Sequence, residues 1–420
     1  MKKVLILTVT AGNGHNACAK GMKEKLESCG AEVKVIDLLK TYSNKWNVWI
    51  ADKGYNIAVA KLRHIYNAFY NLYKAKKPEN RYKCASQGVA ISTVTGLLQE
   101  IYTYKPDVIY CTHFYAAMAI TDLRLVYNIP CKVVVSNLDY VNSPFWEACI
   151  GVDTFAVPSD DFIQESIDEG FKPSQLISVG LPVNEKFILE TSKSEARKKL
   201  GLSDDVFTAL VMFGGGHWGG GFKILKNLIK ALEGRQAQII MINGRNKSSY
   251  DKVAKLQVPQ GIKIVNVGFT NEVDLYMSAS DIALNKLGGT SATEMINKQL
   301  PMVITEKAPA QELYNLKYFK DKGAAKSFKN AKQLKEIVLN LMDNKEEREK
   351  MVSAVASLRK NGIDNLARFM LESEEPVYNQ EYIDKIDYSL VRKNVKKALN
   401  KAHKQTKKEA KEKRQQMKRR

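Results

Sequence analysis

Short runs of consecutive apolar residues recur along the chain, and each is followed by a turn and a segment with helical spacing. The first run, residues 4–9, is typical of a parallel strand that is covered on both faces. In the first half of the chain the same pattern predicts strands at residues 33–38, 108–111, 132–136, 154–157 and 176–179. In the second half it predicts strands at residues 208–213, 238–242, 263–267, 281–284 and 302–305. Strands that alternate with helices in this way predict an α/β fold with parallel sheets.

The two series of strands divide the chain into halves of the same design. In each half the first strand is followed by a glycine-rich turn and a helix, with the turn at residues 12–15 in the first half and at 214–221 in the second. A chain of 420 residues is long enough for two or three domains that each bury a core. We therefore predict a Rossmann-like domain at residues 1–184, a second one with return helices at 185–375, and a tail at 376–420. The two domains are expected to face each other across a cleft.

A further glycine turn in the second half suits an anionic ligand. Gly288 and Gly289 follow a short apolar strand, and a hydroxyl from Thr290 or Ser291 is available as the N-cap of the next helix. The backbone N–H groups and the positive dipole end of that helix favour a phosphate. The Glu294 carboxylate, one turn later, can accept hydrogen bonds from a pair of sugar hydroxyls. This combination suits a nucleotide-sugar, and the alternative is an ordinary Ser-x-x-Glu capping box at a structural helix.

The first glycine turn carries a histidine, His15, next to Gly14. Its imidazole titrates near neutral pH and can take a proton from an acceptor hydroxyl. The turn also has the spacing Gly12-x-Gly14-x-x-Ala17 of dinucleotide-binding folds, and Asp37 ends the next predicted strand, where such folds hold a ribose. An NAD-dependent enzyme is therefore an alternative from a different class. Against it, His15 would lie where the pyrophosphate of a dinucleotide should rest.

Asp139 follows the predicted strand 132–136, at the edge where the active-site groups of parallel sheets gather. It is either a catalytic or orienting carboxylate or a helix cap. No Asp-x-Asp triplet occurs in the chain, so we expect no metal site and no cofactor. Backbone dipoles are expected to stabilise a leaving diphosphate instead. The six cysteines include no Cys-x-x-Cys pair and are expected to be reduced core thiols in a cytoplasmic protein.

Residues 46–77 are rich in aromatic and basic side chains. Aromatic residues recur there at helical spacing, namely Trp46, Trp49, Tyr66, Phe69, Tyr70 and Tyr73. A helix of this kind either lies in a membrane interface or packs against its own domain, and the pattern leaves both alternatives open.

The net charge of +20 is unevenly distributed. The last 30 residues hold 14 Lys or Arg and two Glu, which is a net charge of +12. A basic excess predicts an anionic partner, which is a lipid surface, a phosphate-bearing substrate or a nucleic acid. No aromatic platform accompanies the tail, so we expect an anionic membrane surface rather than a nucleic acid. No window of 18 apolar residues predicts a membrane-spanning helix.

Several motifs together resemble glycosyltransferase family 28, and within it the monogalactosyldiacylglycerol synthases and the bacterial processive diacylglycerol glucosyltransferases. The resemblance covers most of residues 4–325. It is carried by VLILTVTAGNGHNACA near the N-terminus, LDYVNSPFW at 138–146, INGRN at 242–246, VGFTNEVDLYMSASD at 267–281, NKLGGTSATE at 285–294 and APAQELYNLKYF at 308–319. Three features depart from the family pattern, namely Leu287 in place of a proline, Ser143 in place of a histidine, and the long glycine run at 214–221.

The resemblance implies a GT-B fold, a UDP-sugar donor, inversion at the anomeric carbon and a lipid acceptor. It implies that His15 is the catalytic base, assisted by Asp139, and that Phe269 lies beside the uracil. The residues it assigns to UDP are Gly14, Gly215, Gly244, Arg245, Asn246, Phe269, Gly288, Gly289, Thr290 and Glu294. The residues it assigns to the sugar are Gln311, Glu312 and Asn315.

We therefore predict a metal-independent UDP-hexose:diacylglycerol glycosyltransferase, peripheral to the cytoplasmic face of the cell membrane. An alternative within the same class is transfer of N-acetylglucosamine to a polyprenyl-linked or other lipid acceptor.

Overall fold

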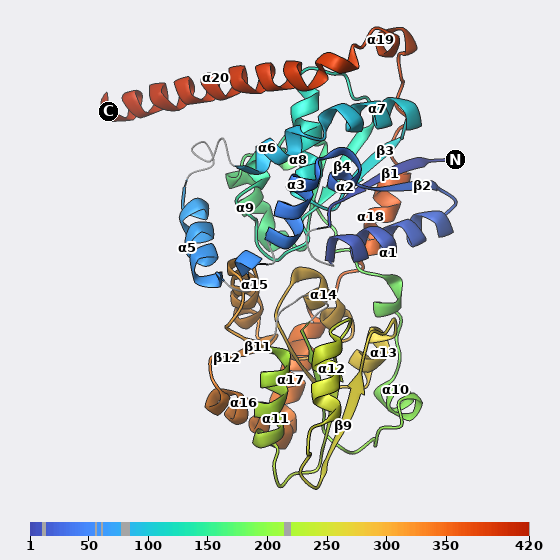
Figure 1. The fold of residues 1–420 in the computed structure, drawn as a ribbon, viewed down its shortest axis with the longest axis vertical. Coiled ribbons are helices and arrows are strands. Elements are labelled where there is room, and N and C mark those ends of the chain that lie inside the picture. Colours follow the sequence, from blue (N-terminus) through green and yellow to red (C-terminus); the bar gives the residue numbers. More distant parts are fainter. Residues whose placement is uncertain (11–13, 55–56, 60–61, 77–84, 214–219, 420) are drawn as a thin grey trace.

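Two domains, each built on a parallel β-sheet, lie one above the other along the long axis of the molecule in the computed structural model (Figure 1). The structure describes residues 1–419 except residues 11–13, 55–56, 60–61, 77–84 and 214–219. Both sheets have six strands in which every described pair is parallel. Parallel strands connected by helices bury both faces of a sheet, which explains the almost uninterrupted apolar runs in the sequence.

The N-terminal sheet has the order β2-β1-β3-β4-β5-β6. Its strands are β1 (Lys3–Thr8), β2 (Glu32–Asp37), β3 (Val108–Cys111), β4 (Lys132–Ser136), β5 (Thr154–Val157) and β6 (Leu176–Ser178). The longer helices of this domain are α1 (Gly14–Ser28), α5 (Arg63–Lys74), α6 (Ala85–Ile91), α7 (Val94–Tyr104) and α8 (Phe114–Arg124). The shorter ones are α2 (Leu38–Tyr42), α3 (Lys45–Trp49), η1 (Ile50–Gly54), η3 (Trp146–Cys149), η4 (Asp160–Phe162), α9 (Ile163–Asp168) and η5 (Pro173–Gln175).

The C-terminal sheet has the order β12-β11-β10-β7-β8-β9. Its strands are β7 (Thr208–Met212), β8 (Ala237–Ile242), β9 (Ile262–Val267), β10 (Ile282–Asn285), β11 (Met302–Thr305) and β12 (Ala325–Phe328). Its helices are α10 (Lys193–Lys199), α11 (Gly221–Ala231), α12 (Lys247–Ala254), α13 (Val273–Ser278), α14 (Gly289–Asn297), α15 (Ala310–Asp321), α16 (Ala331–Asp343) and α17 (Lys345–Ala356).

All eleven strands predicted from the sequence are present, with ends that agree to within one residue. The prediction missed β12, an edge strand of sequence Ala-Lys-Ser-Phe. Its two middle residues are only partly buried, so it has no continuous apolar run to reveal it. The predicted fold class, two facing Rossmann-like domains, is confirmed by the two sheets.

The chain crosses between the domains twice, at neighbouring points. The first crossing follows β6 and leads through η6 (Glu185–Phe187) into the C-terminal domain. The second leads back to α18 (Gly362–Leu371), which packs on α1 of the N-terminal domain. A Cβ atom on Gly362 would lie 2.6 Å from the carbonyl carbon and oxygen of Leu181, and Gly180 has a φ of +92°. The two crossings therefore touch through their backbones, at positions that only glycine allows.

After α18 the chain stays on the N-terminal domain. It forms α19 (Gln380–Asp384), η7 (Tyr388–Leu390) and the long helix α20 (Val391–Arg419). The first turns of α20 pack on α6, α7 and α8 through the buried Val391, Val395 and Leu399. The rest of α20 extends away from the domain, as Figure 1 shows. None of the described helices is long and apolar enough to cross a membrane.

In each sheet the strand order reverses next to the first strand, between β1 and β3 in one domain and between β7 and β10 in the other. The loops after such a pair of strands leave in opposite directions and open a crevice at the carboxyl edge of the sheet. This places α1 and the segment after β3 together in the N-terminal domain, and it places α14 at the matching position of the C-terminal domain.

Candidate active site

The N-termini of α1 and α14 meet across the domain boundary. A Cβ atom on Gly14 would lie 2.7 Å from Thr290 Oγ1, and one on Gly289 would lie 1.9 Å from the carbonyl oxygen of Leu138. Any larger residue at Gly289 would therefore push the two backbones apart. The positive dipole ends of the two helices therefore lie close to each other at the domain boundary.

His15 lies in the first turn of α1 and is held by the segment after β3. Its Nδ1 is 2.5 Å from the carbonyl oxygen of Thr112. Because a carbonyl only accepts hydrogen bonds, Nδ1 carries the proton and Nε2 keeps a lone pair. Burial lowers the pKa of His15 to about 4, against the opposing effect of the Thr112 hydrogen bond. His15 is therefore neutral at physiological pH and offers Nε2 as a base.

A second histidine, His113, packs against the first and was not singled out from the sequence. Its ring centroid lies 4.5 Å from that of His15, at an interplanar angle of 63°. It caps α8, with Nδ1 accepting a hydrogen bond from Tyr115 N at 3.1 Å. Burial, with a smaller effect of His15, holds the pKa of His113 well below its usual value. The Thr-His pair directly after a predicted strand is the sequence signal that indicates it.

Asp139 connects the N-terminal domain to the start of α14. Its Oδ1 accepts hydrogen bonds from Gly289 N at 3.2 Å and from Asn315 Nδ2 at 2.8 Å. It does not cap a helix of its own domain. Burial raises the pKa of Asp139 to about 6, with the Glu312 carboxylate adding to the increase and Asn315, Gly289 and Lys286 opposing it. The Asp139 carboxylate thus already accepts a hydrogen bond from one of the backbone N–H groups that were predicted to bind an anion.

The start of α14 differs from the sequence prediction in one respect. The N-cap is Gly288, which has no side chain, and the Ser291 hydroxyl donates to the Gly288 carbonyl at 3.0 Å. The expectation of a hydroxyl N-cap was therefore wrong, and Ser291 and Glu294 do not form a capping box. Burial raises the pKa of Glu294 to about 8, while Lys186 acts to lower it. Without a capping role, the Glu294 carboxyl remains available to a ligand.

The residues predicted to contact the sugar lie on α15. Glu312 is 7% exposed; its Oε1 pairs with Lys286 Nζ at 2.9 Å, and its Oε2 has no hydrogen-bond partner among the described residues. A buried acceptor of this kind can receive a hydrogen bond from a bound ligand. Gln311 Oε1 accepts a hydrogen bond from Tyr66 at 3.0 Å.

Asn315, also assigned to the sugar from the sequence, is fully buried. Its Nδ2 donates to Asp139 Oδ1 and, at 3.0 Å, to the Leu287 carbonyl, and its Oδ1 accepts from Tyr140 N at 2.8 Å. Both amide protons are therefore already bound to protein acceptors. Asn315 therefore connects the two domains through Asp139 and Tyr140, and it has no N–H group left to donate to a sugar.

Phe269, predicted to lie beside the uracil, follows β9, and three further residues assigned to UDP, namely Gly244, Arg245 and Asn246, follow β8. Phe269 is 62% exposed, and the Arg245 guanidinium lies 5.0 Å from its ring centroid. Gly244 has a φ of +58°, and the Asn246 side chain caps α12 by accepting from Ser249 N at 3.0 Å. Phe269 and Arg245 therefore form an accessible flat surface, whereas the Asn246 side chain is used by the fold.

Two glycines singled out from the sequence, Gly12 and Gly215, lie outside the described residues. The other residue on which an NAD-dependent enzyme would depend is Asp37. Asp37 accepts from Lys40 N and Thr10 N, both at 3.1 Å, and from the Thr10 hydroxyl, so its carboxylate is used by the backbone rather than open to a ribose. Among the residues that the structure describes, no three His, Cys, Asp or Glu side chains gather as a metal ion would require.

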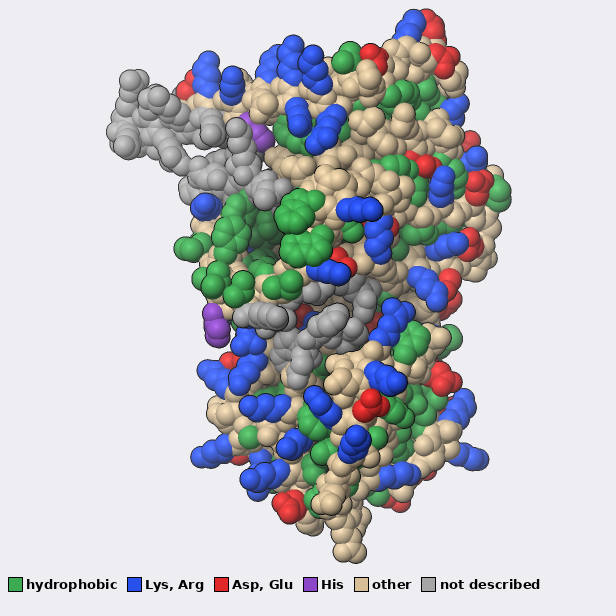
Figure 2. Space-filling view, in the orientation of Figure 1, with side chains coloured by type: hydrophobic (Ala, Val, Ile, Leu, Met, Phe, Trp, Pro, Cys, Tyr) green, Lys and Arg blue, Asp and Glu red, His purple; other side chains and the backbone are tan. Residues whose placement is uncertain are grey.

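An exposed apolar face adjoins the sugar residues. Ile65, Phe69 and Leu72 on α5 and Leu62 at its N-cap are 51–69% exposed. On α3, Trp46 stacks on Trp49, with 66% and 42% exposure. Figure 2 shows hydrophobic side chains gathered at this level of the molecule, beside the domain boundary. We call these six residues the apolar face.

The tyrosines of α5 point the other way. Tyr70 is 4% exposed, so of the two alternatives left open by the sequence this residue follows packing against the protein and not a place in a membrane interface. Tyr66 is half-buried against Gln311, and Tyr73 stacks on Phe145 at 5.6 Å. They lie on the inner side of α5 because α15 of the other domain packs there.

Two family models match the chain. The model described as monogalactosyldiacylglycerol (MGDG) synthase matches residues 15–183, and the glycosyltransferase family 28 C-terminal domain matches residues 210–366. Together they account for both domains.

Similar proteins include the processive diacylglycerol beta-glucosyltransferases of Bacillus pumilus and Staphylococcus aureus. The first is 26% identical over 386 residues, which are 90% of this chain and 97% of the relative. The second is 27% identical over 357 residues, 84% and 88% of the two chains.

Similar folds are found in MurG of Acinetobacter baumannii and in the spinosyn rhamnosyltransferase SpnG. Their TM-scores are 0.59 and 0.57, at 15% and 10% identity, and they cover 89% and 94% of this chain and 100% and 99% of their own. At these identities the likeness shows the fold alone, which is GT-B.

Proposed function

The chain belongs to glycosyltransferase family 28, and on this premise we propose that it transfers a hexose from a UDP-sugar to the free hydroxyl of diacylglycerol at a membrane surface. The observation that carries the acceptor is the match of residues 15–183, almost the whole N-terminal domain, to the model named for a diacylglycerol galactolipid synthase. The relatives named for diacylglycerol glucosyl transfer align with both domains, which supports the same acceptor.

The C-terminal domain holds the donor in this proposal. The N–H groups at the start of α14, at Gly289 and Thr290, lie at the positive end of the helix dipole and receive the diphosphate. Glu294 accepts hydrogen bonds from the ribose, and Phe269 stacks on the uracil. Lys286 is 28% exposed beside Glu312, close enough to the same turn to stabilise charge on the leaving diphosphate.

The hexose lies between α15 and the N-terminal domain. Glu312 Oε2, which no described residue binds, supplies an acceptor for a sugar hydroxyl, and Gln311 lies beside it. Asn315 holds Asp139 in place by donating a hydrogen bond to its carboxylate. Asp139 must release Gly289 N before a phosphate oxygen can take that position, because both cannot bind one N–H.

The reaction is a displacement at the anomeric carbon. The acceptor hydroxyl oxygen forms the new bond to this carbon, and the bond to the β-phosphate oxygen breaks, with its electron pair leaving on UDP. The proton of the acceptor hydroxyl passes to Nε2 of His15, and Nδ1–H of the resulting imidazolium stays bound to the Thr112 carbonyl. Attack from the side opposite the leaving group inverts the configuration. No step calls for a metal ion, and activity is expected to persist in EDTA.

The protein is proposed to reach its lipid by binding peripherally to the cytoplasmic face of the membrane. The apolar face is wide enough for several side chains to enter the lipid interface, and α20 carries a dense positive charge toward anionic headgroups. The α5 helix links this face to the sugar site, because Tyr66 on its inner side contacts Gln311.

Product analysis by mass spectrometry tests the function. Purified protein is incubated with vesicles that contain diacylglycerol or a polyprenyl phosphate acceptor, and with UDP-glucose, UDP-galactose or UDP-N-acetylglucosamine. We expect a hexosyl-diacylglycerol, and we propose glucose as the sugar because the relatives are named for it. Product from the polyprenyl acceptor alone would contradict the proposal. A thermal-shift comparison adds a separate check on the donor, since UDP should raise Tm and NAD should not.

A further inference from the structure

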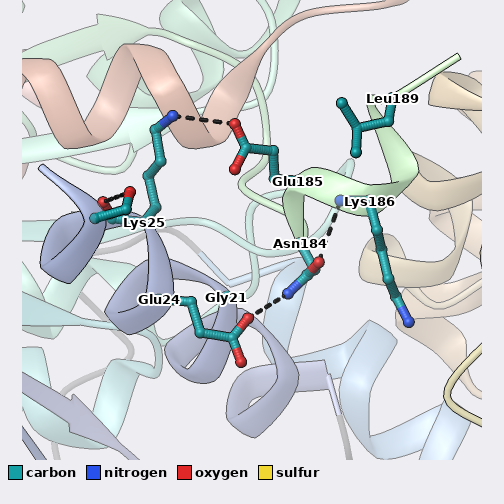
Figure 3. Close-up of a pocket in the computed structure, with 8 residues that line it drawn as sticks. Gly21, Glu24, Lys25, Asn184, Glu185, Lys186 and Leu189 are labelled. Carbon is teal, nitrogen blue, oxygen red and sulfur yellow. Dashed lines mark hydrogen bonds and ion pairs between the residues drawn. The ribbon is translucent and has the colours of Figure 1, made fainter.

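Lys186 lies on η6, in the first crossing between the domains, beside a pocket of about 220 Å³ between α1 and η6 (Figure 3). The other polar residues there bind one another. Lys25 pairs with Glu185 at 3.2 Å, and Asn184 donates to Glu24 at 2.7 Å. In Figure 3 the Lys186 side chain extends away from these pairs. Its ammonium group contacts the C-terminal domain instead.

There it binds the turn that carries the predicted base-binding residue. Lys186 Nζ donates a hydrogen bond to the carbonyl oxygen of Asn271 and lies 3.5 Å from Asp274 Oδ1. Asn271 is two residues after Phe269, in the segment between β9 and α13. The turn therefore has a fixed attachment to the crossing, and the position of Phe269 depends on it.

The same ammonium group is close to the predicted ribose ligand. Lys186 is the nearby cation that acts to lower the pKa of Glu294, and Asp274 acts in the opposite direction. Lys186 thus adjoins both groups assigned to the nucleoside, Phe269 through the turn and Glu294 through its charge. It belongs to neither of the motifs that carry those two residues.

We propose that Lys186 is a positioning residue for the nucleoside of the donor. It holds the turn between β9 and α13 against the crossing, and it supplies a positive charge beside the carboxylate that receives the ribose hydroxyls. This inference rests on the proposed UDP-sugar site. It places the recognition of the nucleoside partly on the segment that connects the domains.

The test compares ligands that differ only in phosphate content. Uridine, UMP and UDP are titrated into the full chain and into Lys186→Met by calorimetry. We expect Kd to rise by about tenfold for all three, because the lost contacts serve the part of the ligand they share. KM for the UDP-sugar should rise by a similar factor while kcat stays within about twofold. Lys186→Arg should recover most of the affinity, since a guanidinium can also donate to the Asn271 carbonyl and pair with Asp274.

Lys298→Met is the matched control. Lys298 Nζ binds the same crossing, through the Leu189 carbonyl at 2.7 Å, but not the turn that carries Phe269. It should leave uridine binding unchanged. Three results would overturn the inference: unchanged uridine affinity in Lys186→Met, a loss confined to UDP, or Lys186→Arg as weak as Lys186→Met. If the unaltered chain fails to bind UDP at all, the proposed function itself is wrong, and this outcome is distinguishable from the others.

Discussion

Two neighbouring histidines show how one backbone contact decides what a side chain can do. The Thr112 carbonyl accepts from Nδ1 of His15, so the lone pair is on Nε2. In His113 Nδ1 accepts from Tyr115 N, so the proton is on Nε2. The two imidazoles are therefore held in opposite tautomers, and His15 is the one that offers Nε2 as a base.

Replacement of His15 by Ala is expected to lower kcat by about 10²- to 10⁴-fold, the usual contribution of a general base. UDP affinity should remain nearly unchanged, because the imidazole acts on the acceptor. Steady-state kinetics and calorimetry with UDP measure the two effects. Lys20→Ala, an exposed position on the same helix, is the control. Turnover that survives in His15→Ala would remove His15 from its role.

Glu294→Gln is expected to change the pH dependence of stability. The folded-state pKa of Glu294 is raised to about 8, so the folded chain binds more protons than the unfolded chain between its ordinary pKa and pH 8. Glu294 therefore destabilises the fold increasingly as pH rises through this range. The variant should melt at a higher temperature than the unaltered chain at pH 8.5, and the difference should vanish near pH 4.

Thermal melts at several pH values check this, with the exposed Glu336→Gln as control. A variant that is equally destabilised at all pH values would mean that Glu294 has a packing role instead of a buried charge.

At the scale of elements, the outer and inner sides of α5 make different contacts. Its outer side carries part of the apolar face. Its inner side contacts α15 through Tyr66 and Gln311, and it contacts the segment before α15 through Asn67 and the Ala308 carbonyl. The helical spacing of the aromatic residues predicted a helix, and α5 confirms this prediction for Tyr66, Phe69, Tyr70 and Tyr73. It did not predict which side faces out, because periodicity fixes the angle between residues but not the neighbour that covers them.

We expect Phe69→Ser combined with Leu72→Ser to weaken binding to vesicles that contain diacylglycerol by about tenfold or more. The two side chains are 64% and 69% exposed, and each should bury its apolar surface in the lipid interface. Vesicle flotation measures this. Val377→Ser removes an apolar side chain that is even more exposed, elsewhere on the surface, and should have no effect. Equal flotation of the double variant would remove the apolar face from membrane binding.

Removal of residues 404–420 is expected to weaken binding to anionic vesicles in proportion to their charge. The deletion takes away nine Lys or Arg and two Glu but keeps the buried part of α20, including Val395 and Leu399. The difference between the truncated and full chains should therefore shrink at high salt, because screening weakens charge attraction. A difference of the same size in 0.05 M and 0.5 M salt would show that α20 does not act through charge.

At the scale of the whole molecule, the two domains are in close contact at the starts of α1 and α14. Gly289 and Gly14 permit this, because neither helix start carries a Cβ. The sequence predicted the strands, the two domains and the glycine turn before α14, since each depends on local pattern. It did not predict that Asp139 binds Gly289 N or that Asn315 joins the domains, because these contacts link residues about 150 and 175 positions apart.

Gly289→Ala is expected to hold the domains apart. Its Cβ would lie 1.9 Å from the Leu138 carbonyl oxygen, whereas a Cβ on Gly288 would meet ordinary contacts at 3.7 Å and beyond. Small-angle X-ray scattering should therefore give a larger radius of gyration for Gly289→Ala than for the unaltered chain, and Gly288→Ala should match the unaltered chain. Identical scattering from all three would mean that the closed arrangement does not persist in solution.

The contact between Gly180, Leu181 and Gly362 has a consequence for how a substrate enters. Because the two covalent connections between the domains pass through one point, the domains can rotate about this point more easily than they can move apart. The displacement then grows with distance from the pivot and is large on the side where α5 meets α15 (Figure 1). A lipid chain would therefore be admitted at the edge that the apolar face borders, and the pivot would keep the opposite edge shut.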